Sequence, residues 1–310
     1  MKKILLVNNQ SLNQDKFVEQ NALLFDSAKE LACQLDIKTN FEVYNLLMSN
    51  ALSKYDAVMF YDKDINLAQK LEIMGYKVFN SSKAIANCDS KALTENCLLK
   101  ANLPRPKTVI IPLCFYYQKE YYNNFVDSLI SYLKLPLICK EWFGSWGEQV
   151  YKLSTKEEIL ALIDKKQGKE LLFQEYISEC CGEDIRINIV GDKVVACMKR
   201  KSLTGDFRAN ISNGGTMEKY EPTEAEKNLA LKATKATGCD FCGVDILQSK
   251  NGPLVCEVNS NAHLLNIYKC TGENVGKDIL KYILKMINKD WISLNFCSNI
   301  LSNNKLCFNN

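Results

Sequence analysis

The segments Cys242-Gly-Val-Asp245-Ile-Leu-Gln248 and Leu254-Val-Cys-Glu257-Val-Asn259-Ser260 decide the fold of this chain. Each is a run of apolar residues that contains an acid, and Asn251-Gly252 between them is a hairpin turn signal. Asp245 and Glu257 are equally far in sequence from Asn251, so a hairpin centred there places them nearly opposite each other. Two carboxylates that close repel each other unless a cation lies between them.

Strand geometry assigns the side chains of the second segment to two faces. Strict alternation predicts Val255, Glu257 and Asn259 on one face, and Cys256 and Val258 on the other. Carboxylate and amide oxygens suit Mg²⁺ that carries a polyphosphate. The hairpin therefore predicts a magnesium site, although the exposed face of an ordinary hairpin explains these residues equally well.

The composition is that of a globular protein. The chain has 310 residues, of which 47% are hydrophobic and 24% charged, enough for two or three domains with cores of their own. A formal charge of +3 with lysine and acid interleaved does not favour nucleic acid or an anionic membrane as a partner. No stretch reaches transmembrane length, and asparagines interrupt the N-terminal apolar run before a signal-peptide core is complete.

Cysteine usage predicts a reduced, cytoplasmic protein. The 14 cysteines sit inside apolar runs, as small hydrophobic residues do. Cys239-Asp-Phe-Cys242 has CxxC spacing, but no second pair completes a zinc site, so a structural role is favoured. The single histidine, His263, fits either a substrate contact or a packed ring.

The N-terminal part predicts a small α/β domain with a parallel sheet over residues 1–87. Asn8-Asn9-Gln10-Ser11 stands where a glycine-rich dinucleotide fingerprint would follow the first strand, which argues against a Rossmann cofactor site. The elements expected there are strands at 3–8, 41–44, 57–60 and 77–79 and helices at 15–35 and 66–74.

Two lysines lie at the ends of predicted elements, in positions where they could bind an anion. Asp89 can cap a helix to Ala101 that carries Lys91 in its first turn, and the strand 135–140 ends in Lys140. The loop Glu141-Trp-Phe-Gly144-Ser-Trp-Gly147-Glu148 follows, before a β-like segment at 149–153. Backbone N–H groups of such a loop can bind phosphate oxygens, although solvated lysines and a plain hairpin also explain these features.

The region from residue 154 to the hairpin combines helix caps with polar strand faces. Ser154–Glu157 and Thr223–Glu226 read as capping boxes, with Gly238 ending the second helix. A strand is expected at 171–177. Alternation in 182–190 predicts a shared polar face for Asp184, Arg186 and Asn188. The basic segment 199–201 and the loop with Arg208 and Asn210 fit a solvated strand end or a site for anionic substrate groups.

The order of these parts resembles the ATP-grasp ligases, in particular the RimK-like branch, whose members ligate glutamate or other amino acids. The resemblance covers residues 88–287. The motifs that carry it are Lys140 with the glycine loop, Gln174-Glu-Tyr-Ile177, Gly182-Glu-Asp-Ile-Arg186, Gly205-Asp-Phe-Arg-Ala-Asn210, Gly214-Gly215, Gly243-Val-Asp245-Ile-Leu247 and Glu257-Val-Asn259.

The resemblance implies an α/β chain with an ATP-grasp fold in which two α+β lobes enclose ATP. The expected domains are the N-terminal domain 1–87, a central lobe 88–174 with a glycine lid, and a C-terminal lobe 175–288 with the magnesium site. A tail, 289–310, lies beyond the resemblance. The sequence leaves open whether the tail packs on the last helix, frays or completes a homo-oligomer contact.

Residue roles implied by the resemblance fall into three groups. ATP, with two Mg²⁺ ions for which Mn²⁺ can substitute, is the expected cofactor set. The metal ligands are Asp245, Glu257 and Asn259. Nucleotide contacts are Lys91, Lys140, the lid residues Gly144, Ser145, Trp146 and Gly147, the adenine-edge residues Glu175, Tyr176 and Ile177, and Asp184, Lys199 and Asn210. Arg186, Arg200 and Arg208 are the candidates to orient a carboxylate and stabilise the transition state.

The implied reaction is carboxylate activation followed by amide formation. A carboxylate attacks the γ-phosphorus of ATP to give an acyl-phosphate and ADP, and an amine then displaces phosphate. The resemblance suggests that glutamate or another amino acid is joined to a peptide, a protein or a small amine. A catalytically silent ATP-binding regulatory protein of the same fold is the alternative. The lid departs from the family in carrying two tryptophans and a phenylalanine, and Ser-Asn-Ala-His263 follows Asn259.

Overall fold

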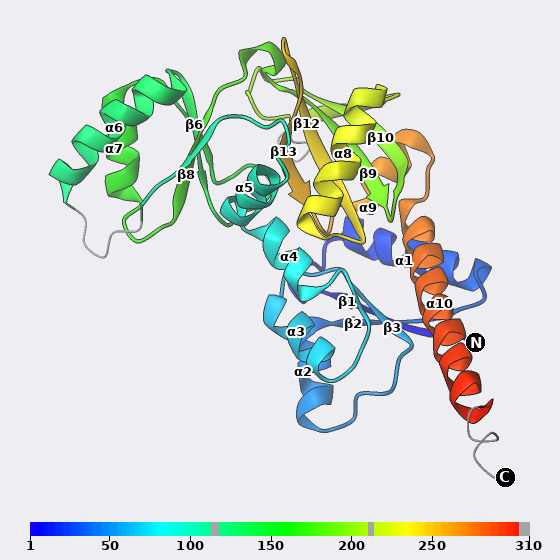
Figure 1. Ribbon diagram of the computed structural model, residues 1–310. Helices are drawn as coiled ribbons and strands as arrows, with labels where there is room; N and C mark the ends of the chain where they lie inside the picture. The colour runs from blue at the N-terminus through cyan, green and yellow to red at the C-terminus, as the bar shows by residue number, and fades with distance from the viewer. Residues whose placement is uncertain (113–117, 210–213, 304–310) are drawn as a thin grey trace. The chain divides into compact units, whose positions relative to one another are not determined.

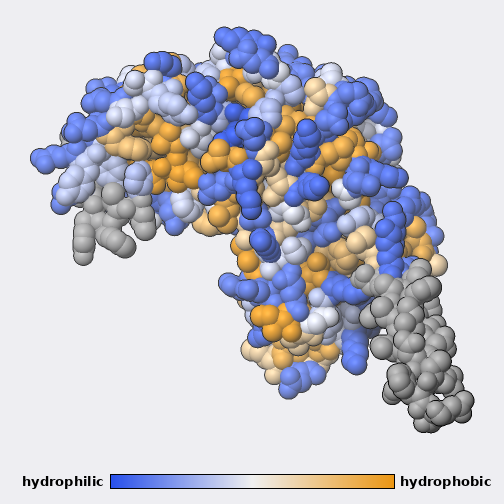
Figure 2. Space-filling view, in the orientation of Figure 1, coloured by the Kyte–Doolittle hydropathy of each residue, from blue (hydrophilic) through white to orange (hydrophobic). Residues whose placement is uncertain are grey.

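The computed structural model describes residues 1–112, 118–209 and 214–303. These residues form two compact units, Lys83–Glu273 and Met1–Ser82 together with the segment that starts at Asn274. The domain boundaries expected at 87, 174 and 288 remain predictions. Hydrophilic residues cover much of the face shown in Figure 2, with hydrophobic residues between them. Within the described ranges, no helix is both long and apolar enough to cross a membrane.

The first unit contains a four-stranded parallel sheet (Figure 1). The strand order is β2-β1-β3-β4, and the central strand β1 is buried on both faces, as parallel strands covered by helices are. The expected parallel sheet is therefore confirmed. The elements of this unit are β1 (Lys3–Asn8), α1 (Asp15–Glu30), β2 (Gln34–Thr39), α2 (Asn40–Met48), β3 (Ala57–Phe60), α3 (Ile65–Ile73), β4 (Val78–Phe79) and α10 (Val275–Asn303).

The strand expected at 41–44 is wrong, because these residues lie in helix α2. A capping box starts the helix: the Thr39 hydroxyl accepts a hydrogen bond from the backbone N–H of Glu42, and the Glu42 carboxylate accepts one from the N–H of Thr39. The strand is instead the preceding segment, β2, so helix α1 ends at Glu30 and does not reach 35. The apolar residues after Asn40 obscured this cap.

The first half of the second unit is an antiparallel sheet covered by two helices. Its order is β5-β8-β6-β7, and α6 and α7 lie side by side (Figure 1) around a core that includes Val126 and Phe173. Ser90 caps α5 in place of Asp89, and Thr155 caps α7 in place of Ser154. The elements are α4 (Ser82–Asp89), α5 (Lys91–Lys100), β5 (Thr108–Ile110), α6 (Lys119–Leu133), β6 (Leu137–Glu141), β7 (Val150–Leu153), α7 (Lys156–Lys165) and β8 (Leu171–Glu175).

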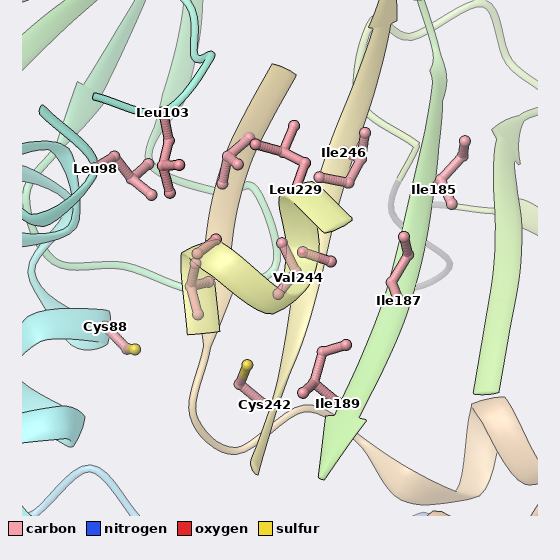
Figure 3. Packing of buried hydrophobic residues seen from close by; sticks show 14 of the residues in the cluster. Cys88, Leu98, Leu103, Ile185, Ile187, Ile189, Leu229, Cys242, Val244 and Ile246 are labelled. Carbon is pink, nitrogen blue, oxygen red and sulfur yellow. The ribbon is translucent and has the colours of Figure 1, made fainter. Parts of the chain in front are cut away.

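The second half of this unit is a five-stranded antiparallel sheet, with the order β11-β10-β9-β12-β13. Helix α8 packs on one face over isoleucines and valines of the sheet (Figure 3). The capping box of Thr223 and Glu226 is confirmed, and Gly238 ends α8 in the left-handed conformation. The elements are η1 (Ser178–Cys180), β9 (Glu183–Val190), β10 (Lys193–Ser202), β11 (Gly215–Lys219), α8 (Glu224–Thr237), β12 (Phe241–Ser249), β13 (Gly252–Asn259) and α9 (Leu264–Thr271).

The β12–β13 hairpin places Asp245 opposite Glu257, as its turn signal predicts. The next pair is Ile246 with Val255, so Cys256 is an extra residue on β13. Such a bulge sets two residues against one and breaks the alternation of faces. Val255 and Val258 consequently both lie in the core, at 1% and 0% exposure. The expectation that Val255 shares a face with Glu257 is wrong for this reason.

Candidate functional site

A cleft in the second unit brings three predicted site residues together. Lys91 begins helix α5, Lys140 lies near the end of β6, and Glu257 lies on β13. The Lys91 ammonium is 3.7 Å from the nearer Glu257 oxygen. The residues that line the cleft are Lys91, Thr94, Glu95, Leu98, Lys140, Leu172, Gln174, Val255, Cys256 and Glu257.

Lys140 is a buried cation on the wall of this cleft. Its residue exposure is 8%, and its ammonium lies 3.7 Å from the Cys256 sulfur. Burial raises the pKa of the Cys256 thiol, so this neighbour is neutral at pH 7. A buried ammonium is stable when it has an anionic or strongly polar partner. The position therefore suits a ligand that carries negative charge, such as a polyphosphate.

Two cations hold the glycine loop that follows β6. The Lys91 ammonium donates a hydrogen bond to the Gly144 carbonyl at 3.1 Å, and the Arg208 guanidinium donates one to the Gly147 carbonyl at 2.7 Å. Trp146 and Gly147 adopt positive φ angles of 59° and 76°. The Trp146 side chain is half exposed. The structure thus joins the predicted lid to both Lys91 and Arg208.

Four charged side chains form a largely buried cluster on strands β9, β10 and β12. Arg186 donates to both oxygens of Asp245, with Nη2 2.8 Å from Oδ2. Arg200 donates to both oxygens of Asp184 at 2.6 Å and also lies 3.0 Å from an oxygen of Asp245. Side-chain exposures between 7% and 14% keep water largely out of this cluster. Two guanidinium groups therefore balance two carboxylates.

The two carboxylates respond differently to this environment. Burial alone would raise the pKa of Asp245, but Arg186 and Arg200 together hold it below its ordinary value. Burial raises the pKa of Asp184 in spite of its pairing with Arg200, and the nearby Asp245 charge acts in the same direction. Asp245 is therefore the member that stays ionised most readily, as a metal ligand requires.

The predicted metal ligands lie on adjacent strands. Asp245 faces Glu257 across the hairpin, and the Asn259 amide donates to Asp245 Oδ2 at 3.3 Å. Two carboxylates and an amide offer the oxygen donors that Mg²⁺ prefers, so the residues fit this ion. In the described parts of the chain, no group of three or more His, Cys, Asp and Glu residues is arranged as a metal site.

Four of the remaining predicted contacts are not among the residues that line the cleft, namely Glu175, Tyr176, Ile177 and Lys199. The Glu175 carboxylate accepts a hydrogen bond from the backbone N–H of Lys107 at 2.8 Å, and the Tyr176 ring lies under the Lys152 ammonium. Lys199 pairs with Glu183 at 2.6 Å. Ile177 is the residue before η1, and Asn210 lies outside the described residues. The roles assigned to these residues remain predictions.

Sequence reasoning assigned no site role to four polar residues that line the cleft: Thr94, Glu95, Gln174 and Cys256. Glu95 is one helical turn after Lys91, a spacing that places both on the same face of α5. Its carboxylate is 2.5 Å from Arg105 Nε, an ion pair beside the cleft. Cys256 enters the lining through the bulge, which the sequence pattern does not signal.

Comparisons with known proteins identify this architecture. A RimK-like ATP-grasp domain matches residues 88–283. The chain is 34% identical over 270 residues to a protein of Vibrio atlanticus named "Probable alpha-L-glutamate ligase", covering 84% of this chain and 86% of that one. It is 31% identical over 299 residues to "Probable alpha-L-glutamate ligase 2" of Pseudoalteromonas atlantica, covering 92% and 96%.

Solved structures show the same fold. The D-alanine–D-alanine ligase of Bacillus anthracis superposes with a TM-score of 0.71 at 17% identity, covering 94% of this chain and 99% of that one. A RimK domain ATP-grasp protein of Sphaerobacter thermophilus gives a TM-score of 0.67 at 16% identity, covering 91% and 99%. The predicted ATP-grasp architecture is confirmed. The chain belongs to the RimK-like ATP-grasp family and is an ATP-dependent C–N ligase.

Proposed function

We propose that this enzyme joins L-glutamate, through its amine, to a carboxylate of a peptide, protein or small molecule that ATP has activated. The observation that carries the proposal is the cleft in which Lys91, Lys140 and Glu257 meet beside Asp245 and Asn259. The choice of glutamate is supported by the names of the relatives at 31–34% identity.

The residues in and around the cleft have two roles in this reaction: some neutralise charge, and others hold the phosphates and the metal ions in position. Lys140 and Lys91 neutralise charge that develops on the γ-phosphoryl group as the acceptor carboxylate attacks it. The glycine loop offers backbone N–H groups to the phosphates and covers them from water. Asp245, Glu257 and Asn259 would hold two Mg²⁺ ions, which when bound supply further charge stabilisation to the terminal phosphates.

The arginines act on the organic substrates. Arg208, which holds the Gly147 carbonyl, can turn to the acyl-phosphate formed on the acceptor. Arg186 is placed beside Asp245 and can orient a carboxylate through its remaining N–H donors. Arg200 is enclosed by Asp184 and Asp245, so it acts by positioning these two carboxylates. The amine of glutamate then displaces phosphate and leaves an amide.

The test is a product assay with Mg-ATP, each of the twenty amino acids, and a set of peptides and small acids as acceptors. We expect ADP release to depend on both glutamate and an acceptor, and mass spectrometry to find an acceptor heavier by one glutamate residue. ADP release that ignores every amino acid would refute the proposal. Nucleotide-dependent thermal stabilisation without any product would indicate the catalytically silent regulatory protein instead.

A further inference from the structure

Three cysteines from two distant segments of the second unit, Cys88 and the pair Cys239 and Cys242, lie near the end of helix α8. Cys88 near the end of α4 has its sulfur 3.2 Å from the sulfur of Cys239, which is 151 residues later in the chain. Cys242 at the start of β12 has its sulfur 3.1 Å from the hydroxyl of Thr234 on α8. Figure 3 shows the Cys88 sulfur pointing away from α4 toward the elements that carry Cys242.

The three thiols differ in their surroundings. Cys88 and Cys242 are buried, at 5% and 4% exposure, whereas Cys239 in the turn between α8 and β12 is partly exposed. Hydrogen bonds from Cys242 and Cys88 lower the pKa of Cys239 well below its ordinary value. The hydrogen bond to Cys239 and burial raise the pKa of Cys88. Cys239 is thus the more exposed and the more readily ionised thiol of this pair, and Cys88 is its buried partner.

We propose that Cys239 and Cys88 form a reversible disulfide, with Cys239 as the attacking thiol and Cys242 as the hydrogen-bond donor that positions it. The oxidant is a small-molecule disulfide. The Cys239 thiolate attacks one sulfur of this disulfide, forms a mixed disulfide and releases the other half as a thiolate. Cys88 then loses its proton to solvent and attacks the Cys239 sulfur, which releases the second half. Two protein thiols are oxidised and one small disulfide is reduced to two thiols.

The geometry needs little change for this bond to form. An S–S bond is about 2.05 Å long, so the two sulfurs must approach by roughly 1 Å. A hydrogen bond already joins the two segments next to these cysteines, because the Asn87 amide donates to the Thr237 carbonyl at 3.0 Å. A disulfide here would link α4 to the turn that follows α8. Its α4 partner, Cys88, lies three residues before Lys91 in the sequence. This proposal does not depend on the substrate of the ligase.

The experiment uses the full-length reduced protein and oxidised glutathione. We expect a mass loss of about 2 Da and a tryptic cross-link between peptide 84–91, which contains Cys88, and peptide 236–250, which contains Cys239 and Cys242. Closing so long a loop should raise Tm by about 5–10 °C, and dithiothreitol should reverse the rise. The cross-link should be absent from C88S and C239S, and present in C242S and in C97S, whose altered thiol lies on α5.

Several outcomes would overturn the proposal. A cross-link that persists in C239S would make Cys242 the partner of Cys88. A stable glutathione adduct on Cys239 without the 2 Da loss would show that Cys88 does not resolve it. Stoichiometric zinc in the purified protein, lost in C88S and C239S, would assign the three thiols to a metal instead.

Discussion

Arg186 pairs with both carboxylate oxygens of Asp245, while Glu257, directly across the hairpin from Asp245, is 3.7 Å from Lys91 and 30% exposed. The two predicted metal ligands therefore differ in how much the fold depends on them. Replacing Asp245 by Asn leaves two buried guanidinium groups without half of their counter-charge. We expect Asp245→Asn to lower the free energy of unfolding by about 3–5 kcal/mol, measured by urea denaturation.

Glu257→Gln is the matched control. Because the Glu257 carboxylate is more exposed and its partner is 3.7 Å away, this change should cost less than about 1 kcal/mol of stability. Both variants should lose the magnesium dependence of nucleotide binding. Equal losses of stability in Asp245→Asn and Glu257→Gln would contradict the inference that the fold depends more on Asp245 than on Glu257.

Lys140→Met should weaken nucleotide binding. The variant keeps the length and apolar stem of the side chain but removes the buried ammonium from the cleft wall. Loss of one charge-assisted contact corresponds to about 2–3 kcal/mol, or roughly 30- to 150-fold in the Kd for Mg-ATP by calorimetry. Lys165→Met, in the exposed last turn of α7, should leave the Kd unchanged. An unaltered Kd in the Lys140 variant would remove this lysine from the site.

Gly243→Ala should displace Arg186. A Cβ at Gly243 would lie 2.8 Å from Arg186 Cδ and 2.7 Å from the Ala262 Cβ, both closer than atoms can pack. We expect about 1–3 kcal/mol less stability by thermal unfolding and a lower kcat, because the guanidinium loses its alignment with Asp245. Adding Ala262→Gly removes one of the two clashes and should restore part of both quantities. No recovery in the double variant would point to a different cause.

Glu183 should add a pH-dependent increment of stability. Hydrogen bonds from Lys199 and then Lys201 lower the pKa of Glu183 from its ordinary value of 4.5. Because the folded pKa is the lower one, this increment is fully present above pH 4.5 and is lost as the pH falls through the folded value. Because the Glu183 side chain is 29% exposed, solvent screening limits the increment to about 0.5–1 kcal/mol.

Urea denaturation of the native protein and of Glu183→Gln across this pH range measures the increment. The native protein should be the more stable of the two at pH 7, and the difference should shrink toward zero as the pH falls below 4.5 and through the lower folded pKa. A difference that stays constant with pH would mean that the two lysines do not favour the ionised carboxylate.

Local signals were sufficient where neighbours in sequence decide the structure. The Asn251-Gly252 turn fixes the register that sets Asp245 against Glu257, and Thr223 with Glu226 starts α8 through bonds three residues apart. The same kind of signal at Thr39 was obscured by the apolar residues that follow it. The resemblance to the ligases then supplied the order of the remaining parts.

The contacts that the sequence did not predict are those between residues far apart in the chain. The pairing of Arg200 with Asp184 needs β9 and β10 side by side in one register, 16 residues apart in the chain. The approach of Cys88 to Cys239 spans 151 residues. Such contacts depend on how the strands and helices assemble, and no local pattern encodes them.

The extra residue on β13 has a consequence for how this strand tolerates change. If Cys256 is left out, Val255, Glu257, Val258 and Asn259 alternate strictly between two faces of the strand, because Val255 and Val258 are buried in the core whereas Glu257 and Asn259 are partly exposed. Deleting Cys256 would therefore keep every neighbour on its own side, whereas deleting Val258 would bring Asn259 into the core position. Cys256 has no partner in the strand pairing, so its side chain lines the cleft while Glu257 and Asn259 keep the face that they share.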